Sequence, residues 1–236
     1  MPFTIPDKVQ INANSKTVGI DLNSKHVIVL DDGSAVVNPK HLLAKEKKLK
    51  RYQRQYSRKT NGSNNKNKAR IKLARLHEKV ANTRKDFIDK ITLDIVRNND
   101  VIVIEDLNVK AMQKWNGRMI QSAPFGMIRS KLTWKANKLG KHLVVTGRYV
   151  PTSKVCSDCG QIHEFGLDTR WLSCDCGNEI HRDHNAAKNI LNVGLSTAGI
   201  AGRACGETKV HDASNGIRWV SLSPVGPKQE DTRSSA

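Results

Sequence analysis

The chain has 236 residues, of which 38% are hydrophobic and 26% charged, so it is long enough to bury one sizeable core and a smaller module. Its 40 Lys and Arg against 22 Asp and Glu give a net charge of +18, which makes nucleic acid the expected partner. No apolar run is long enough to span a membrane, and five cysteines without a signal-peptide pattern argue against a disulfide framework. We therefore expect a cytoplasmic, nucleoid-associated protein with reduced cysteines.

The first segment is rich in β-branched residues, which predicts strands. Residues 17–21 and 26–30 are followed by a Gly-containing turn at 31–34 and by the apolar residues 35–37. Strand-like runs joined by such a turn predict an antiparallel meander.

Two helices are expected next, over about 42–59 and 68–97, with a polar break at 60–67. Residues 41–90 hold 17 Lys or Arg against 4 acidic residues, a local net charge of +13. A charged helical face is often merely solvated, but this concentration favours a ridge that contacts phosphates without reading sequence. The expected contacts are Lys47, Arg51, Arg54 and Arg58.

The apolar run 101–104 predicts a strand that is buried on both faces and ends at Glu105. A helix is expected over about 125–139, where Gly140 ends it. Residues 142–146 predict a second buried strand.

A loop is expected over 110–121, and a further helix opens at about 185–192. The Gly-, Ser- and Pro-rich residues after about 194 predict a poorly ordered tail. Trp115 and Trp134 are expected to pack in the core rather than to stack on bases.

Four cysteines are spaced as C-x2-C, 14 residues, then C-x-C, and each pair is followed by a glycine. Two such turns present four thiolates to a tetrahedral zinc ion, whereas a redox C-x-x-C motif would not need a second pair. Because the second pair is one residue short, His163 or His181 could replace a cysteine; Cys205 is expected to be an ordinary thiol. The expected ligands are Cys156, Cys159, Cys174 and Cys176.

Three acidic residues occupy matching places in the predicted elements. Asp21 and Glu105 each end a strand, and Asp183 opens the last helix. If the two strands are parallel, their carboxylates emerge at one sheet edge, where three oxygen ligands would bind Mg²⁺ or Mn²⁺ for phosphodiester cleavage. Singly, each acid is better explained as a surface group or, for Asp183, a helix N-cap. Together, their order matches the RNase H-like plan.

Four motifs then occur in order: residues 18–22 (VGIDL), 101–109 (VIVIEDLNV), 153–156 (SKVC) and 182–187 (RDHNAA). With the helical hairpin, they make residues 17–191 resemble the TnpB (OrfB) nucleases of bacterial and archaeal insertion sequences. These nucleases are relatives of the type V CRISPR effectors.

The resemblance implies an α/β, RNase H-like (RuvC) mixed sheet with an inserted basic helical hairpin at 41–97 and a C-terminal zinc ribbon. It also implies a catalytic triad of Asp21, Glu105 and Asp183 that uses magnesium or manganese, a structural zinc, and a guide RNA that directs cleavage of DNA in a prokaryotic cell. Arg182 could contact the scissile phosphate or cap the ribbon.

The expected domains are a nuclease domain over 1–150, the ribbon over 151–180, the last nuclease helix over 181–194 and a tail over 195–236. Family members carry an N-terminal region that grips guide RNA; because the first strand begins near residue 17, we expect a truncated form. The alternative is a non-catalytic nucleic-acid-binding regulator or remnant built from the hairpin and ribbon. A zinc-ribbon transcription factor is a weaker alternative, since it does not need three acids.

Overall fold

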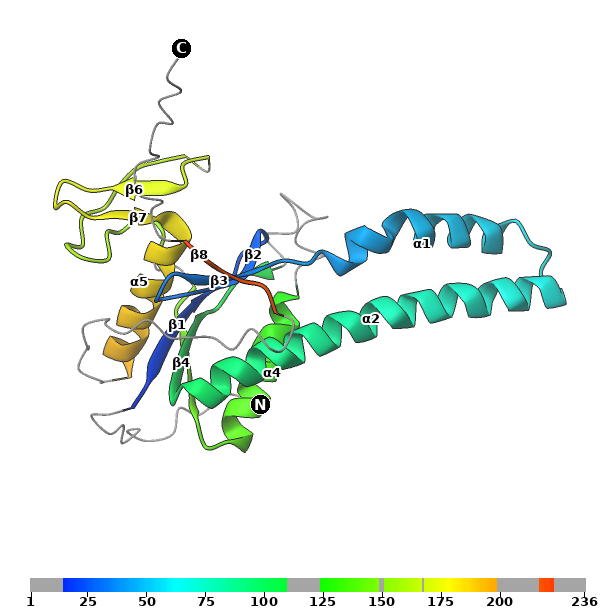
Figure 1. Ribbon diagram of the computed structural model, residues 1–236, viewed down its shortest axis with the longest axis horizontal. Helices are drawn as coiled ribbons and strands as arrows, with labels where there is room; N and C mark the ends of the chain where they lie inside the picture. Colours follow the sequence, from blue (N-terminus) through cyan, green and yellow to red (C-terminus); the bar gives the residue numbers. More distant parts are fainter. Residues whose placement is uncertain (1–14, 110–123, 149–150, 167, 199–216, 223–236) are drawn as a thin grey trace, which may run out of the picture.

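A computed structural model of the chain describes residues 15–109, 124–148, 151–166, 168–198 and 217–222. Its centre is a six-stranded mixed sheet in the order β5-β4-β1-β2-β3-β8 (Figure 1). The strands are β1 (Thr17–Asp21), β2 (His26–Leu30), β3 (Ser34–Val37), β4 (Val101–Glu105), β5 (His142–Thr146) and β8 (Trp219–Ser221).

Strands β1 to β3 form the predicted antiparallel meander. On the other side of β1, β4 and then β5 run parallel to it. Ile20 lies opposite Ile104, so β1 and β4 end together at Asp21 and Glu105. The condition for gathering these two carboxylates at one sheet edge is therefore met.

Two long helices, α1 (His41–Ser57) and α2 (Asn64–Asn98), form a hairpin that projects from the sheet (Figure 1). α2 begins earlier than predicted, because the Ser63 hydroxyl accepts the backbone N–H of Lys66 at 3.2 Å and caps the first turn. The polar break is correspondingly shorter.

Helices cover both faces of the sheet. α2 and α4 (Phe125–Lys138) pack on one face, and α5 (Arg182–Thr197) packs on the other. β4 is buried on both faces, as predicted, because its apolar side chains alternate between two clusters. Ile102 and Ile104 pack with the α2–α4 layer, and Val101 and Val103 pack with α5.

Two glycines let α5 lie directly on the sheet. A Cβ atom on Gly19 of β1 would be 2.3 Å from the Ala187 carbonyl oxygen, and one on Gly194 of α5 would be 2.1 Å from Val103 Cγ1. Neither position has room for a side chain, because Gly19 faces the backbone of α5 and Gly194 faces the Val103 side chain of β4.

Two strands differ from expectation. β5 is the last strand on its side of the described sheet, and Val145 is 38% exposed, so the prediction of burial on both faces is wrong there. The predicted tail is wrong for residues 217–222, since β8 pairs with β3 and Ile217 is buried. Local composition could not reveal a strand whose partner is so distant in sequence.

The packing role predicted for Trp134 is also wrong: its side chain is 57% exposed, and the Lys138 ammonium lies 4.9 Å from its ring centre. Trp115, the predicted 110–121 loop and Cys205 lie outside the described residues. Within the described part of the chain, no helix has the length and apolar character needed to cross a bilayer.

We expect Gly19→Ala to lower the free energy of unfolding by about 1–3 kcal/mol, because the new methyl group overpacks the interface with α5. Urea denaturation would measure the change. Gly126→Ala is the matched control, since a Cβ there meets nothing within 4 Å. That variant should be neutral or stabilising by up to about 1 kcal/mol, and equal destabilisation of both variants would contradict the interpretation.

Candidate metal and nucleic-acid site

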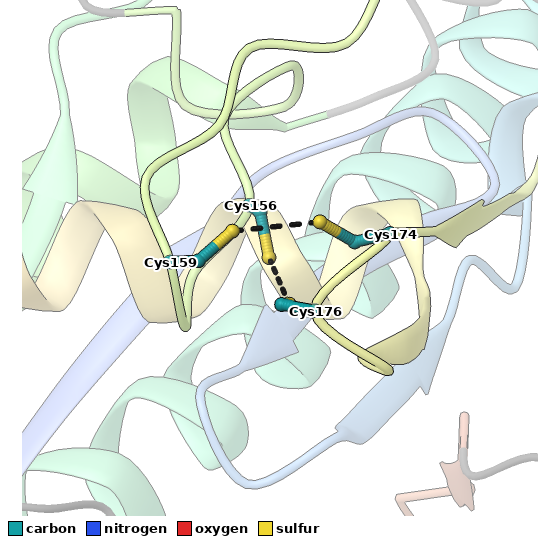
Figure 2. Close-up of side chains that lie close together, drawn as sticks. All are labelled: Cys156, Cys159, Cys174 and Cys176. Carbon is teal, nitrogen blue, oxygen red and sulfur yellow. Dashed lines mark hydrogen bonds between the residues drawn. The ribbon is translucent and has the colours of Figure 1, made fainter.

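The four cysteines converge between two short turns (Figure 2). All four sulfur atoms lie within 4.8 Å of one another, with Cys156 and Cys176 at 3.8 Å and Cys159 and Cys174 at 3.4 Å. A tetrahedral zinc ion with Zn–S bonds of about 2.3 Å requires sulfur–sulfur distances of about 3.8 Å. The donor set and its spacing therefore fit zinc.

Within the cysteine cluster the pKa values of Cys174 and Cys176 are raised by burial and by hydrogen bonds among the thiols, whereas the surroundings of Cys156 favour a thiolate. Burial alone would raise its pKa, but backbone N–H groups of Cys159 and Asp158 and the side chain of Asn178 donate to the sulfur and lower its pKa to about 6. A thiolate is the form of cysteine that binds metal.

The histidine alternatives find no support. His181 Nδ1 accepts the backbone N–H of Asp183 and so caps α5. Among the described residues, the four cysteines are the side chains that lie close enough together to share a metal ion. Neither His163 nor His181 is part of that group.

Helix α5 holds the cysteine module through two asparagines. Asn185 accepts the backbone N–H of Ser157 at 2.9 Å and donates to the Val155 carbonyl at 2.7 Å. Asn189 donates to the carbonyls of Thr152 and Val155, both at 2.7 Å. On the other side, β6 (Trp171–Ser173) pairs with β7 (Glu179–His181), and β7 runs directly into α5. The module is therefore fixed to the helix that bears Asp183.

Asp21 and Asp183 are joined by one amide. Asn23 Nδ2 donates to Asp21 Oδ2 at 3.3 Å and to Asp183 Oδ2 at 3.1 Å, across 160 residues of sequence. Glu105 ends the neighbouring parallel strand. The three carboxylates are less tightly gathered than the cysteines, because they do not form a group whose ligand atoms all lie within 4.8 Å.

The acids affect one another electrostatically. Burial, followed by the negative charge of Asp183, raises the pKa of Asp21 to about 7, and Glu105 adds to the effect. Burial and the adjacent Asp106 raise the pKa of Glu105. Asp106 itself is paired with Arg129 and Arg148. A divalent cation would relieve the repulsion among Asp21, Glu105 and Asp183, and their oxygen donors suit Mg²⁺ or Mn²⁺.

Arg182 reaches both candidate features. Its Nε atom lies 3.8 Å from Asp183 Oδ1, and its guanidinium also donates to the Gly166 carbonyl of the cysteine module at 3.5 Å. The geometry is compatible with both predicted roles of this side chain, at the acidic cluster and at the ribbon.

The predicted cationic row lies along one side of α1. Lys47, Arg51, Arg54 and Arg58 are all exposed. Together with Lys50 and Gln55 they line a hollow of about 550 Å³. Lys50 is partly neutralised by Glu46 at 2.8 Å. Because its four side chains are exposed, the row presents positive charge directly to solvent, as a contact with a phosphate backbone requires.

Sequence reasoning missed three side chains at these sites: Asn23, Asn185 and Asn189. Asn23 directly follows the VGIDL motif, and Asn185 is part of RDHNAA, so proximity to an acidic motif was the available signal. Their partners could not be read from the sequence, because each asparagine bonds to groups distant in the chain.

Two protein-family models match successive parts of the chain. Residues 1–116 match the OrfB family model described as "Probable transposase". Residues 125–190 match the model described as "Cas12f1-like, TNB domain". The two matches follow one another along the chain and together include both predicted acidic strand ends, the cysteine cluster and Asp183.

Several curated relatives are named as nucleases. A Streptomyces pristinaespiralis protein named "Putative RNA-guided DNA endonuclease" is 40% identical over 199 residues, covering 83% of this chain and 48% of the relative. "Putative RNA-guided DNA endonuclease InsQ" of Escherichia coli (strain K12) is 34% identical over 221 residues, covering 84% and 52%. The chain thus spans about half the length of these curated relatives.

The fold is similar to that of one chain in a cryo-EM structure of the Cas12f1–sgRNA–target DNA complex. The TM-score is 0.53 at 20% sequence identity, with 78% of this chain and 51% of that chain covered. The ordered family matches and the similarity to the curated relatives confirm the resemblance seen in the sequence motifs: the chain belongs to the TnpB (OrfB) family.

Proposed function

We propose that this chain contains the catalytic part of a divalent-metal-dependent DNA endonuclease with an RNase H-like (RuvC) core. In this proposal, residues 1–150 and the helix at 181–194 form the nuclease domain, and residues 151–180 form a zinc ribbon inserted before that helix. The parallel placement of β1 and β4, with α5 across them, supports the core assignment.

One observation supports the catalytic assignment above the others. Asp21 and Asp183 share the amide of Asn23, and Asp21 has a pKa raised to about 7 by burial and by the charges of Asp183 and Glu105. Holding like charges close together and partly buried costs folding free energy. Strongly shifted pKa values of this kind concentrate at functional sites.

The roles of the residues follow from their chemistry. Asp21, Glu105 and Asp183 hold the divalent cations, which when bound activate a water molecule and stabilise the leaving oxygen of a phosphodiester. Arg182, beside Asp183, contacts the phosphate that is cleaved. The cationic row on α1 contacts backbone phosphates without distinguishing bases.

Zinc bound by Cys156, Cys159, Cys174 and Cys176 fixes the ribbon, and the ribbon in turn supports the start of α5. Asn185 and Asn189 tie the helix to the first cysteine turn, and the His181 cap connects β7 with Asp183. Zinc therefore has an indirect effect on the acidic site.

The nucleic acids are proposed from the relatives. The curated relatives are named as RNA-guided DNA endonucleases, so we propose a DNA substrate and a guide RNA for the protein to which this chain corresponds. The high positive charge of the hairpin is suited to either polyanion.

Asp21→Asn should abolish Mn²⁺-dependent cleavage of single-stranded DNA, with a loss of at least about 100-fold, because a charged ligand of the cation is removed. Fluorescence of a quenched oligonucleotide would measure the rate. Asp86→Asn, at an exposed acid paired with Lys90, is the control and should cleave normally. Undiminished cleavage by Asp21→Asn contradicts the proposal, and DNA binding with no metal-dependent cleavage by the unaltered chain favours a non-catalytic binding protein.

The same variant should stabilise the metal-free protein at high pH. Because the folded pKa of Asp21, about 7, exceeds its ordinary value of 3.8, its ionisation opposes folding progressively as the pH rises from about 4 to 7. Asp21→Asn should therefore match the unaltered chain near pH 4 and exceed its stability by about 2–4 kcal/mol above pH 7. Urea unfolding at both pH values would measure this, and a pH-independent difference would contradict the assigned pKa.

Cys174→Ser should bind much less than one zinc ion per chain. The ribbon should then unfold, because binding of structural zinc contributes about 10–16 kcal/mol to the folding of such modules. Elemental analysis and thermal melting would measure both effects. Cleavage should fall with the zinc content, since α5 loses its support. Cys205→Ser is the control and should keep zinc; zinc-free protein that cleaves at the normal rate would contradict the coupling.

Arg54→Ala should weaken binding to double-stranded DNA and reduce the slope of log K against log salt by about 0.9, the effect of one lost phosphate contact. Fluorescence anisotropy over a salt series would measure the slope. Lys90→Ala is the control, because Lys90 is already paired with Asp86 at 2.9 Å. An unchanged slope for Arg54→Ala would exclude this side chain from the interface.

A further inference from the structure

The turn between β1 and β2 fixes the orientation of Asn23. Its Oδ1 atom accepts the backbone N–H groups of Lys25 at 3.1 Å and of His26 at 2.8 Å. Both partners are donors, so the atom facing them is the amide oxygen and the amide nitrogen must point the other way. The turn therefore decides which end of the side chain faces the acids.

The amide nitrogen meets two carboxylates from different elements. Nδ2 lies 3.3 Å from Asp21 Oδ2, at the end of β1, and 3.1 Å from Asp183 Oδ2, in the first turn of α5. Hydrogen bonds to charged carboxylates are stronger than neutral ones, and here one donor group serves both. Without it, the two carboxylates would lose the hydrogen-bond donor that they share.

The contacts use only one oxygen of each carboxylate. Asn23 bonds to the two Oδ2 atoms and makes no contact with the Oδ1 atoms, while the Asp21 carboxylate also accepts the Leu22 backbone N–H. For Asp183 the near neighbour of Oδ1 is Arg182 Nε, at 3.8 Å, which is longer than a hydrogen bond. Asn23 can therefore remain in place while both acids bind a cation.

From this geometry we propose that Asn23 is a positioning residue of the acidic site. Its turn-anchored amide holds the Asp21 and Asp183 carboxylates in the orientation in which they bind one divalent cation together. The assignment rests on the proposed function, since it presupposes that these acids bind the cation. Asn23 itself is not a ligand, because its amide oxygen is occupied by the turn.

A second asparagine separates this role from that of an ordinary turn residue. Asn38 Oδ1 likewise accepts a backbone N–H, from Lys40 at 2.9 Å, but its Nδ2 donates to the Ser24 carbonyl at 2.9 Å. Both asparagines stabilise local backbone in the same region of the fold. Only Asn23, of the two, presents its amide nitrogen to acidic side chains.

The test is Mn²⁺ binding to the full, zinc-loaded chain, measured from the electron paramagnetic resonance signal of free Mn²⁺. Asn23→Ala should weaken binding by about 10–100-fold, the usual effect of removing a hydrogen-bond partner of a metal ligand. Asn23→Ser should weaken binding to a similar extent. Its hydroxyl can still accept the turn N–H groups but is too short to reach the acids, so it keeps the fold if the alanine variant does not.

Two controls distinguish the possible failures. Asn38→Ala should bind Mn²⁺ as the unaltered chain does, and an equal loss there would reduce Asn23 to a structural residue and overturn the inference. Binding that Asp21→Asn abolishes but Asn23→Ala and Asn23→Ser leave unchanged would also overturn it, with the proposed function intact. Mn²⁺ binding that Asp21→Asn does not affect would contradict the proposed metal site itself.

Discussion

The direct contact between α5 and the sheet is the constraint on which the rest of the arrangement depends. Gly19 and Gly194 remove the side chains that would otherwise separate helix from strands. As a result Asp183, at the start of α5, comes within reach of the residues that follow β1. The same helix ties down the cysteine module through Asn185 and Asn189, so one close-packed interface positions both candidate metal sites.

Charge is distributed in opposite ways in the acidic cluster and in the helical hairpin. Negative charge is concentrated at the end of β1 and β4 and at the start of α5, where burial makes it costly. Positive charge is spread along an exposed hairpin, where water screens it. Phosphates that the hairpin attracts would be repelled by the acidic cluster, because both carry negative charge.

Much of the fold could be predicted because its signals are local. Strands β1 and β4 follow from apolar runs, and the cysteine cluster follows from spacing that only tight turns allow. Three features could not be predicted from local sequence: the partial exposure of β5, the existence of β8 and the exposure of Trp134. Each depends on which element, distant in sequence, lies alongside. Asn23 shows the same limit at the site: its turn is local, but the importance of its amide depends on Asp183, 160 residues away.

β8 has a consequence for the order in which the sheet is completed. It pairs with β3, so one side of the meander is covered by residues that leave the ribosome long after β3 itself. Until then β3 is an open edge of mainly apolar residues, the kind of surface that pairs with other chains. A chain interrupted before residue 217 would keep every candidate ligand and yet leave that edge exposed. Its aggregation would then reflect an unfinished sheet rather than a damaged site.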